Sequence, residues 1–236
     1  MKNSDHKNPY HLFFYMLQLL KIFDVGTHYY YPKCDNQMVE DALNNLPKRF
    51  VRELTIRADC KYIESTIESF ERIDPRDECW IFQYIRTLYQ DIWSTCKQVK
   101  GKYTYISRRQ ASVRRILNEA DYLEDLKQLG VSVYCMEDLS FVDQIKLFAE
   151  SEILTGPHGA AFSFAIFCQP GTLLYEIYRA DHIKGHYAIL ANECNLRYKR
   201  FFDVEFNEVT HDMTINKESY IDSLRDLIEF SCLSDS

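Results

Sequence analysis

The sequence lacks several patterns that would place it quickly in a known class. It has eight cysteines but no Cys-x-x-Cys pair and no zinc-finger spacing of Cys and His. We interpret the cysteines as isolated buried thiols in a reducing compartment, although their even number would permit disulfides. Gly-x-Ser-x-Gly is absent, which argues against a serine hydrolase. Gly-x-Gly-x-x-Gly and the Walker loop are absent too, and no acidic pair at a strand end suits a metal-bound diphosphate.

Long hydrophobic runs are also missing. The first apolar stretch runs only from Leu12 to Phe23 and contains Gln18 and Lys21, so it is too short and too polar to cross a bilayer. No secretory signal precedes it. We therefore expect a cytoplasmic protein without a transmembrane segment, unless the sequence is a fragment of a longer chain.

The charge balance is mildly acidic. With 28 basic and 35 acidic residues the net charge is −7, which argues against nucleic acid as a partner, although local basic patches could bind phosphates. The sequence leaves open whether the protein forms a homo-oligomer.

The pattern of the 236 residues predicts an α/β chain with a boundary at Gln98–Lys102, dividing residues 1–97 from residues 98–236. From Tyr103 onward, short strands alternate with helices, which is typical of a doubly wound parallel sheet. We predict strands over His28–Tyr31, Phe50–Ile56, Tyr103–Ser107, Val131–Cys135, Ile153–Thr155 and Thr172–Tyr178. We predict helices over Pro9–Asp24, Asn36–Asn45, Asp77–Cys96, Glu119–Leu129, Ala160–Cys168, Tyr187–Cys194 and Lys217–Phe230, and one after the capping box that begins at Ser140.

A tight turn at Gly156–Gly159, which we call the corner, interrupts this pattern within "ILTGPHGAAFSFAIF". Gly156, His158 and Gly159 follow a short strand and precede a predicted helix. A helix N-terminus favours anions, and glycines let a ligand approach the backbone. His158 could donate to a phosphate or move a proton. The alternative is a tight turn with a solvated histidine.

Two further features follow predicted strands and so fall at the same sheet edge. This edge is where ligands bind, because ligand sites lie beyond the carboxyl ends of parallel strands. In "ISRRQASVRRILNE", four arginines follow a strand. They suit phosphate, or they form a solvated basic loop. Glu176 closes the apolar strand "LLYEIY", where it could accept hydrogen bonds from a ribose or pair with an arginine.

Histidines elsewhere are less informative. His11 opens the helix in "NPYHLFFYMLQLL" and could be an exposed or capping residue. His182 and His186 lie four residues apart, but no His-Glu-x-x-His motif surrounds them, so we expect no metal site.

The order of these motifs resembles glycosyltransferase family 61. The resemblance is dense from Tyr103 to Tyr178 and includes "ISRR", "VRRILNE", "EDLSF", "HGA", "FCQPG" and the strand that ends in Glu176. The family includes O-linked GlcNAc transferases, plant xylosyl- and arabinosyltransferases and bacterial capsule-type enzymes. It implies a GT-B fold, in which two Rossmann-like domains face each other across a cleft; here the N-terminal one is short.

The resemblance also implies the chemistry. We expect an inverting, metal-independent transfer from a nucleotide sugar, with a UDP-sugar as the first candidate, to a hydroxyl of a glycan or glycoprotein. No further cofactor is implied. Arg108 and Arg114 would neutralise the diphosphate, and His158 and Gly159 would contact it. The remaining implied residues are Ser107, Asn118, Gly156 and Glu176 for the donor, with Glu176 near the ribose. An inverting transfer also needs a general base, and we expect His11 in this role because it could face the cleft from the first domain.

Two alternatives remain. Family members often carry an aspartate four residues after the histidine of the early helix, and Tyr15 occupies that position here. This replacement and the short first half would suit a nucleotide-sugar-binding pseudoenzyme or partner subunit. A different nucleotide-binding enzyme on a similar sheet is the second alternative.

Overall fold

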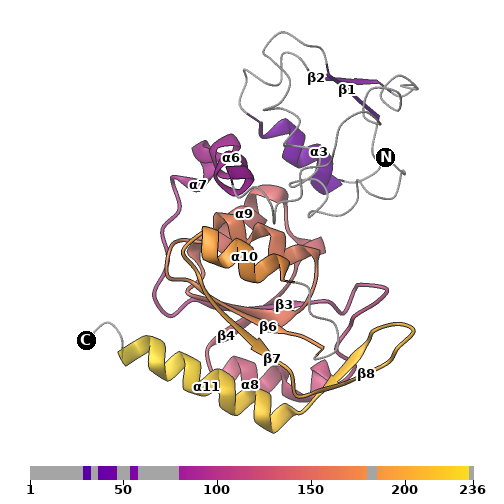
Figure 1. Cartoon of the computed structure of the whole chain (residues 1–236), viewed down its shortest axis with the longest axis vertical. Coiled ribbons are helices and arrows are strands. Elements are labelled where there is room, and N and C mark those ends of the chain that lie inside the picture. The colour runs from indigo at the N-terminus through magenta and orange to yellow at the C-terminus, as the bar shows by residue number, and fades with distance from the viewer. Residues whose placement is uncertain (1–28, 33–36, 47–53, 58–79, 180–184, 234–236) are drawn as a thin grey trace.

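A sheet of five parallel strands forms the centre of the protein (Figure 1). The computed structural model describes residues 29–32, 37–46, 54–57, 80–179 and 185–233. The strand order is β4-β3-β5-β6-β7, and every neighbouring pair is parallel. The predicted α/β class with a parallel sheet is therefore confirmed. The strands are β3 (Tyr103–Ser107), β4 (Val131–Cys135), β5 (Ile153–Pro157), β6 (Leu173–Ile177) and β7 (Arg197–Phe201).

Helices cover both faces of the sheet, and each face has its own core. Successive side chains of a strand point to opposite faces, so Ile106 and Leu154 lie in one core while Tyr105 and Ile153 lie in the other. Figure 1 shows α9 and α10 on one side of the sheet and α8 and α11 on the other. The first core contains α3 (Gln37–Asn44), α6 (Trp80–Leu88), α7 (Gln90–Trp93), η4 (Met136–Asp138), α9 (Phe141–Glu150), η5 (Ala160–Phe167) and α10 (His186–Glu193). The second contains η3 (Glu119–Tyr122), α8 (Leu123–Gln128) and α11 (Lys217–Leu233).

The helix that follows the predicted capping box has the expected form. The hydroxyl of Ser140 accepts a hydrogen bond from the main-chain N–H of Asp143 at 3.2 Å and so caps α9. Phe141, Ile145 and Phe148 are all buried, as their spacing predicts. The local sequence alone was sufficient here because the cap and the apolar face lie within one element.

Three segments of the central sheet and its covering helices differ from the predictions. The helix expected over Ala160–Cys168 is the 3₁₀ helix η5, buried from Phe162 onward, and no polar face gives it the amphipathic pattern of a surface α-helix. The helix expected over Asp77–Cys96 is broken at Tyr89 into α6 and α7. Strand β7 was not predicted, because "RYKRF" is a charged edge strand rather than an apolar run.

Two small sheets complete the described fold. β1 (Tyr29–Pro32) pairs in parallel with β2 (Leu54–Arg57), close to two of the predicted strands. β8 (Val204–Phe206) and β9 (Met213–Ile215) form an antiparallel pair that was not predicted. The predicted helix at Pro9–Asp24 lies outside the described residues, and the domain boundary near residue 97 stays a prediction.

The order of the strands fixes where a ligand would bind. The chain passes from β3 to β4 on one side and then returns to pair β5 on the other side of β3. The carboxyl ends of β3 and β5 therefore form a topological switch point, the usual position of ligand sites in such sheets. The two strands approach closely there: a Cβ added at Gly156, where φ is +149°, would lie 2.5 Å from the carbonyl oxygen of Ile106.

Candidate functional site

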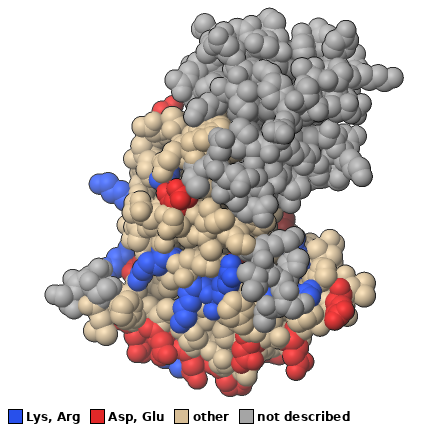
Figure 2. Space-filling view, viewed as in Figure 1, with Lys and Arg blue, Asp and Glu red and all other residues tan. Residues whose placement is uncertain are grey.

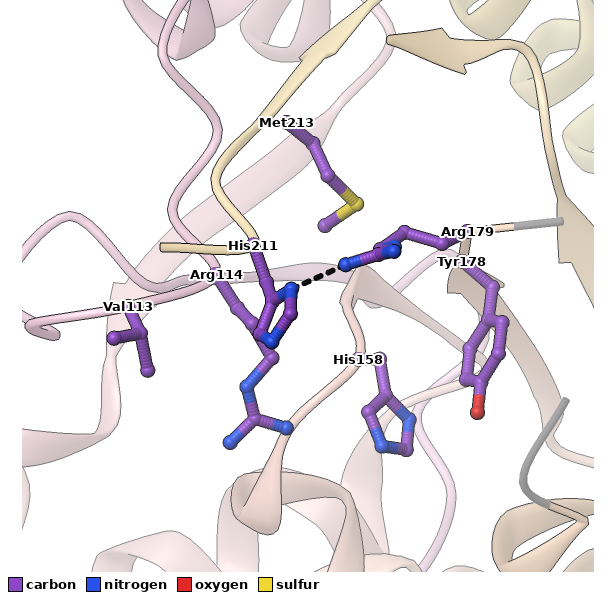
Figure 3. Close-up of a pocket in the computed structure, with 7 residues that line it drawn as sticks. All are labelled: Val113, Arg114, His158, Tyr178, Arg179, His211 and Met213. Carbon is purple, nitrogen blue, oxygen red and sulfur yellow. Dashed lines mark hydrogen bonds between the residues drawn. The ribbon is translucent and has the colours of Figure 1, made fainter. Parts of the chain in front are cut away.

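A pocket of about 380 Å³ opens at this switch point (Figure 3). Two of its lining residues, Arg114 and His158, were predicted from the sequence. Among the described residues that line the pocket none is acidic, whereas two are arginines and two are histidines, so the pocket suits an anion. The lining residues are Val113, Arg114, His158, Tyr178, Arg179, His211 and Met213.

The charges of the protein are unevenly distributed. Figure 2 shows Lys and Arg side chains gathered across the middle of the viewed face, at the level of the sheet. Asp and Glu side chains concentrate at the end of the molecule where α8 and α11 lie. The net charge of −7 therefore hides a local excess of positive charge, which is what a phosphate ligand requires.

His158 is held by a buried carboxylate. Its Nδ1 lies 2.5 Å from Oε1 of Glu176, whose side chain is only 1% exposed. Pairing of β5 with β6 places Glu176 opposite Gly156, two residues before the histidine. The other carboxylate oxygen, Oε2, accepts a hydrogen bond from the hydroxyl of Tyr198. Both oxygens of Glu176 thus have protein partners.

Aromatic rings fix the histidine from its other sides. The ring centroid of His158 lies 4.7 Å from that of Tyr178 and 5.4 Å from that of Tyr187. Tyr187 also donates a hydrogen bond from its hydroxyl to the carbonyl of Gly159 at 2.7 Å. The main-chain N–H of His158 donates to the carbonyl of Ile177 at 2.9 Å. The corner is therefore a rigid part of the fold, not a solvated turn.

Arg108 packs directly against this corner. A Cβ added at Gly159 would lie 2.2 Å from its Nη1, so only glycine leaves room for the guanidinium. Nη2 donates to the carbonyl of Val113 at 3.2 Å, while the buried Nε has no hydrogen-bond partner among the described residues. Burial, and then the charge of Arg114, lower the pKa of Arg108 to about 10. An anion at the corner would favour the charged guanidinium and so oppose the lowering of this pKa.

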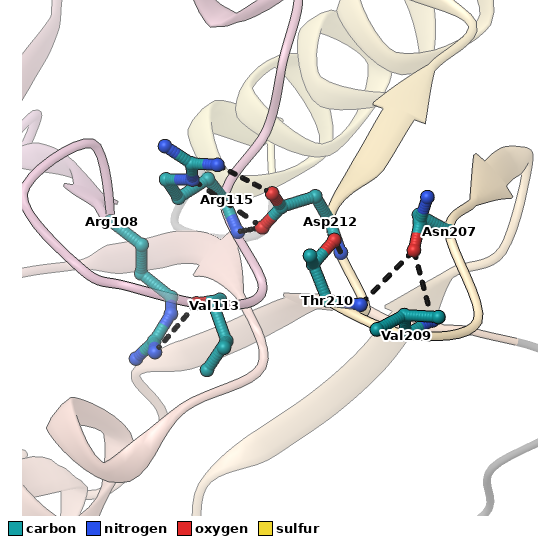
Figure 4. A network of polar contacts seen from close by, with 7 residues as sticks. All are labelled: Arg108, Val113, Arg115, Asn207, Val209, Thr210 and Asp212. Carbon is teal, nitrogen blue, oxygen red and sulfur yellow. Dashed lines mark hydrogen bonds and ion pairs between the residues drawn. The ribbon is translucent and has the colours of Figure 1, made fainter.

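A pair of loops carries the two left-handed residues of the pocket. Arg114 and His211 both have φ of +59°. Their neighbours Arg115 and Asp212 form an ion pair (Figure 4), with Nη2 at 2.7 Å from Oδ2. The hydrogen bond from Arg115 lowers the pKa of Asp212. The pair joins the loop after β3 to the β8–β9 hairpin and so positions Arg114 and His211.

Arg179 reaches the pocket from the end of β6. Its guanidinium carbon lies 3.7 Å from the ring centroid of Phe206, a cation–π contact. Its Nη1 contacts Nδ1 of His211 (Figure 3). An arginine has no acceptor, so it donates and the histidine accepts. The two side chains contact each other and line the pocket together.

The remaining predicted residues lie nearby but make structural contacts. Ser107 is buried and donates to Glu119 Oε2 at 2.7 Å. Asn118 pairs with the main chain of Ile215, donating to its carbonyl at 2.9 Å and accepting from its N–H at 3.1 Å. Neither lines the pocket, and their roles toward a donor stay predictions. His11 lies outside the described residues.

Several pocket residues were missed by sequence reasoning. Tyr178 and Arg179 follow β6 directly, so the strand-end rule that singled out Glu176 could have included them. His211 is brought in by the unpredicted β8–β9 pair, and no local pattern signals it.

The residues that the structure describes include neither a metal-binding cluster nor a membrane-spanning helix. Within them no cluster of three or more His, Cys, Asp or Glu side chains could hold a metal ion. No helix in the same part of the chain is long and apolar enough to cross a membrane. His182, the partner considered for His186, lies outside this part.

Comparisons with known proteins agree on one family. A family model described as Glycosyltransferase 61 matches residues 27–175, more than half of the chain. The EGF domain-specific O-linked N-acetylglucosamine transferase of Drosophila melanogaster is 30% identical over 105 residues, which is 43% of this chain. The match covers 20% of the fly protein's length. Tyr178, Arg179 and His211 lie beyond the end of the family match.

Proposed function

We propose, because the chain belongs to the glycosyltransferase 61 family, that it transfers a sugar from a nucleotide sugar to a hydroxyl of a glycan or protein. The observation that carries the proposal is the cationic pocket at the switch point, to which Arg114 and Arg179 contribute guanidinium groups. A leaving diphosphate needs compensating positive charge in the transition state, and guanidinium groups supply it in a fixed geometry.

The pocket has the charge to hold the diphosphate. Arg114 and Arg179 approach from different loops. Arg108 packs against the corner, and its buried Nε has no hydrogen-bond partner in the described part of the chain. The pocket volume of about 380 Å³ leaves space for a diphosphate and adjoining groups. In this proposal the arginines, rather than a metal ion, neutralise the leaving group.

The proposal includes an inverting reaction on a GT-B fold. The five-stranded sheet would be the nucleotide-binding half, and residues 1–97 would contribute the acceptor side. An inverting transfer requires one base that removes the proton of the acceptor hydroxyl. The name of the fly relative makes N-acetylglucosamine the first sugar to test, which we would supply as its UDP derivative, and it makes an EGF-domain hydroxyl the first acceptor.

A donor screen tests this function. Release of nucleoside diphosphate is measured with UDP-, GDP- and TDP-sugars, with and without acceptors. We expect turnover with a UDP-sugar. Arg114→Ala should weaken it roughly tenfold to hundredfold, since a hydrogen bond to a charged group contributes about 1.5–3 kcal/mol. Arg225→Ala is the matched control, because Arg225 pairs with Asp222 on the surface of α11.

The same screen distinguishes a glycosyltransferase from the second candidate, a protein that only binds a nucleotide sugar. The second candidate is favoured by Tyr15, which stands where family members often carry an aspartate. Such a protein would bind a nucleotide sugar through Arg114 but release no diphosphate above the background of the blank reaction. If no nucleotide in the panel bound at all, both candidates would be wrong.

A further inference from the structure

A chain of polar contacts runs from the edge strand β7 to the pocket. Arg200 donates from Nε to the hydroxyl oxygen of Tyr198 at 2.7 Å. Tyr198 donates its proton to Oε2 of Glu176, and Oε1 of the same carboxylate lies 2.5 Å from Nδ1 of His158. We call these four residues the relay. Every link has a defined direction, because arginine only donates and an ionised carboxylate only accepts.

The direction of the relay fixes the proton on the histidine ring. Glu176 can accept only from an Nδ1 that carries hydrogen, so neutral His158 has its proton on Nδ1 and a lone pair on Nε2. Glu176 is fully buried and is not among the pocket-lining residues, whereas His158 is, with 14% of its side chain exposed. Nε2 is therefore the ring nitrogen left for the pocket (Figure 3).

The fold holds this arrangement from several sides. Arg200 lies over the ring of Tyr198, with its guanidinium carbon 5.1 Å from the centroid, and at the same distance from the ring of Tyr178. Tyr178 in turn packs on the imidazole. Burial, and then the charge of Glu176, raise the pKa of Tyr198, so its hydroxyl stays a proton donor. If His158 rotated, the buried Oε1 of Glu176 would lose its hydrogen bond, which opposes the rotation.

We propose that Glu176 is a positioning residue that fixes the Nδ1–H form of His158, and that Nε2 of His158 is the proton acceptor for the attacking hydroxyl. This inference rests on the proposed function. It gives Glu176 a role other than ribose binding, and it makes His158, rather than His11, the base instead of a contact of the diphosphate. The acceptor hydroxyl passes its proton to Nε2 as its oxygen bonds to the anomeric carbon of the sugar. The bond from that carbon to the diphosphate oxygen breaks, and its electron pair stays on the diphosphate. The proton on Nε2 then leaves to solvent.

The experiment compares Glu176→Gln, which keeps the shape but removes the charge, with Tyr198→Phe, which removes only the outer link. The matched control is Glu152→Gln. Glu152 is another buried carboxylate, held by the N–H of Gly101 at 2.6 Å and by Ser231, at the opposite end of the sheet. Thermal melting identifies any variant that fails to fold, and Tyr198→Phe then carries the test.

Nitrogen-15 spectra of the histidine rings read the tautomer directly, with His158→Gln used to assign the signals. We expect Nδ1–H and an unprotonated Nε2 for His158 in the wild type, and a growing share of the Nε2–H form in Glu176→Gln. The kcat should fall roughly hundredfold or more in His158→Gln and Glu176→Gln and less in Tyr198→Phe, with little change in KM for the donor. Glu152→Gln should match the wild type in both readouts.

An Nε2–H tautomer in the wild type, or one unaffected by Glu176→Gln, would overturn the positioning role. A kcat for Glu176→Gln equal to that of Glu152→Gln would overturn the assignment of the base. If the wild type transfers no sugar, the proposed function is contradicted, and the role of His158 as the base is contradicted with it. The positioning role of Glu176 is tested separately, because the tautomer of His158 is read without any transfer of sugar.

Discussion

Two glycines of the corner should separate stability from nucleotide binding. Alanine adds one methyl group at either position, but the two methyl groups meet different neighbours. At Gly156 the new Cβ would lie 2.5 Å from the main-chain carbonyl oxygen of Ile106, with φ at +149°. At Gly159 the backbone is extended, and the Cβ would lie 2.2 Å from Nη1 of Arg108.

Gly156→Ala should destabilise the protein. The carbonyl oxygen belongs to β3 and cannot yield without moving one central strand away from the next. The unfavourable φ costs about 1–3 kcal/mol and the overlap about 1–3 kcal/mol more. At about 2–4 °C per kcal/mol for a chain of this size, even the lower sum of about 2 kcal/mol reduces Tm by about 4–8 °C.

Gly159→Ala should instead weaken binding. The methyl group meets the far end of a long side chain, which can move aside, so the free energy of unfolding should change by less than about 1 kcal/mol. The displaced guanidinium of Arg108 no longer lies against the corner. The Kd for UDP should then rise roughly tenfold, which corresponds to about 1.4 kcal/mol and lies near the lower end for a hydrogen bond to a charged group.

Differential scanning calorimetry and titration with UDP measure the two effects. Gly185→Ala is the control, because no atom of the described residues lies within 4 Å of the added Cβ and φ is −79°. A Gly156→Ala protein that melts like the wild type would refute the strain argument. A Gly159→Ala protein that binds UDP as tightly as the control would refute the role given to Arg108.

Three further predictions follow from the pocket and its supports. Arg179→Ala should raise the Kd for UDP roughly tenfold, while Arg225→Ala leaves it unchanged. Equal Kd values for the two variants would show that Arg179 does not contribute to UDP binding. Ser107→Ala should lower Tm by a few degrees, because Glu119 loses a buried donor, yet leave the Kd for UDP within about twofold; a large change in Kd would instead support the donor-binding role predicted from the sequence. Because Arg115 lowers the pKa of Asp212, that ion pair stabilises the protein above the ordinary pKa of 3.8 and is lost as the pH falls through the lowered value. Asp212→Asn should therefore be less stable at neutral pH and lose less stability as the pH falls below the ordinary pKa of 3.8 in melting experiments; a decline as steep as that of the wild type would contradict this assignment.

The fold was predictable where local patterns decide it. The capping box at Ser140 and the apolar spacing of α9 are properties of one short segment, and four of the five central strands are apolar runs. The strand β7 and the β8–β9 pair were not predictable in this way, since neighbouring segments determine where these half-polar chains pair. The 3₁₀ form of η5 depends equally on its burial among other helices.

The site was predictable in its position more than in its contacts. The strand-end rule brought Arg114, His158 and Glu176 to one edge of the sheet, and the structure places them there. The contact between Glu176 and His158 depends on the register of β5 against β6, which no local pattern reveals. His211 reaches the pocket from the β8–β9 hairpin, which the Arg115–Asp212 pair joins to the loop after β3, and these two segments are far apart in the sequence.

The most direct test of the central claim compares UDP with uridine in calorimetric titrations of the wild type and of Arg114→Ala. If the pocket holds the diphosphate of a nucleotide sugar, UDP binds the wild type at least about tenfold more tightly than uridine, and Arg114→Ala removes most of that difference. Equal affinities of UDP and uridine for the wild type, or an Arg114→Ala variant that keeps the full difference, would contradict the account.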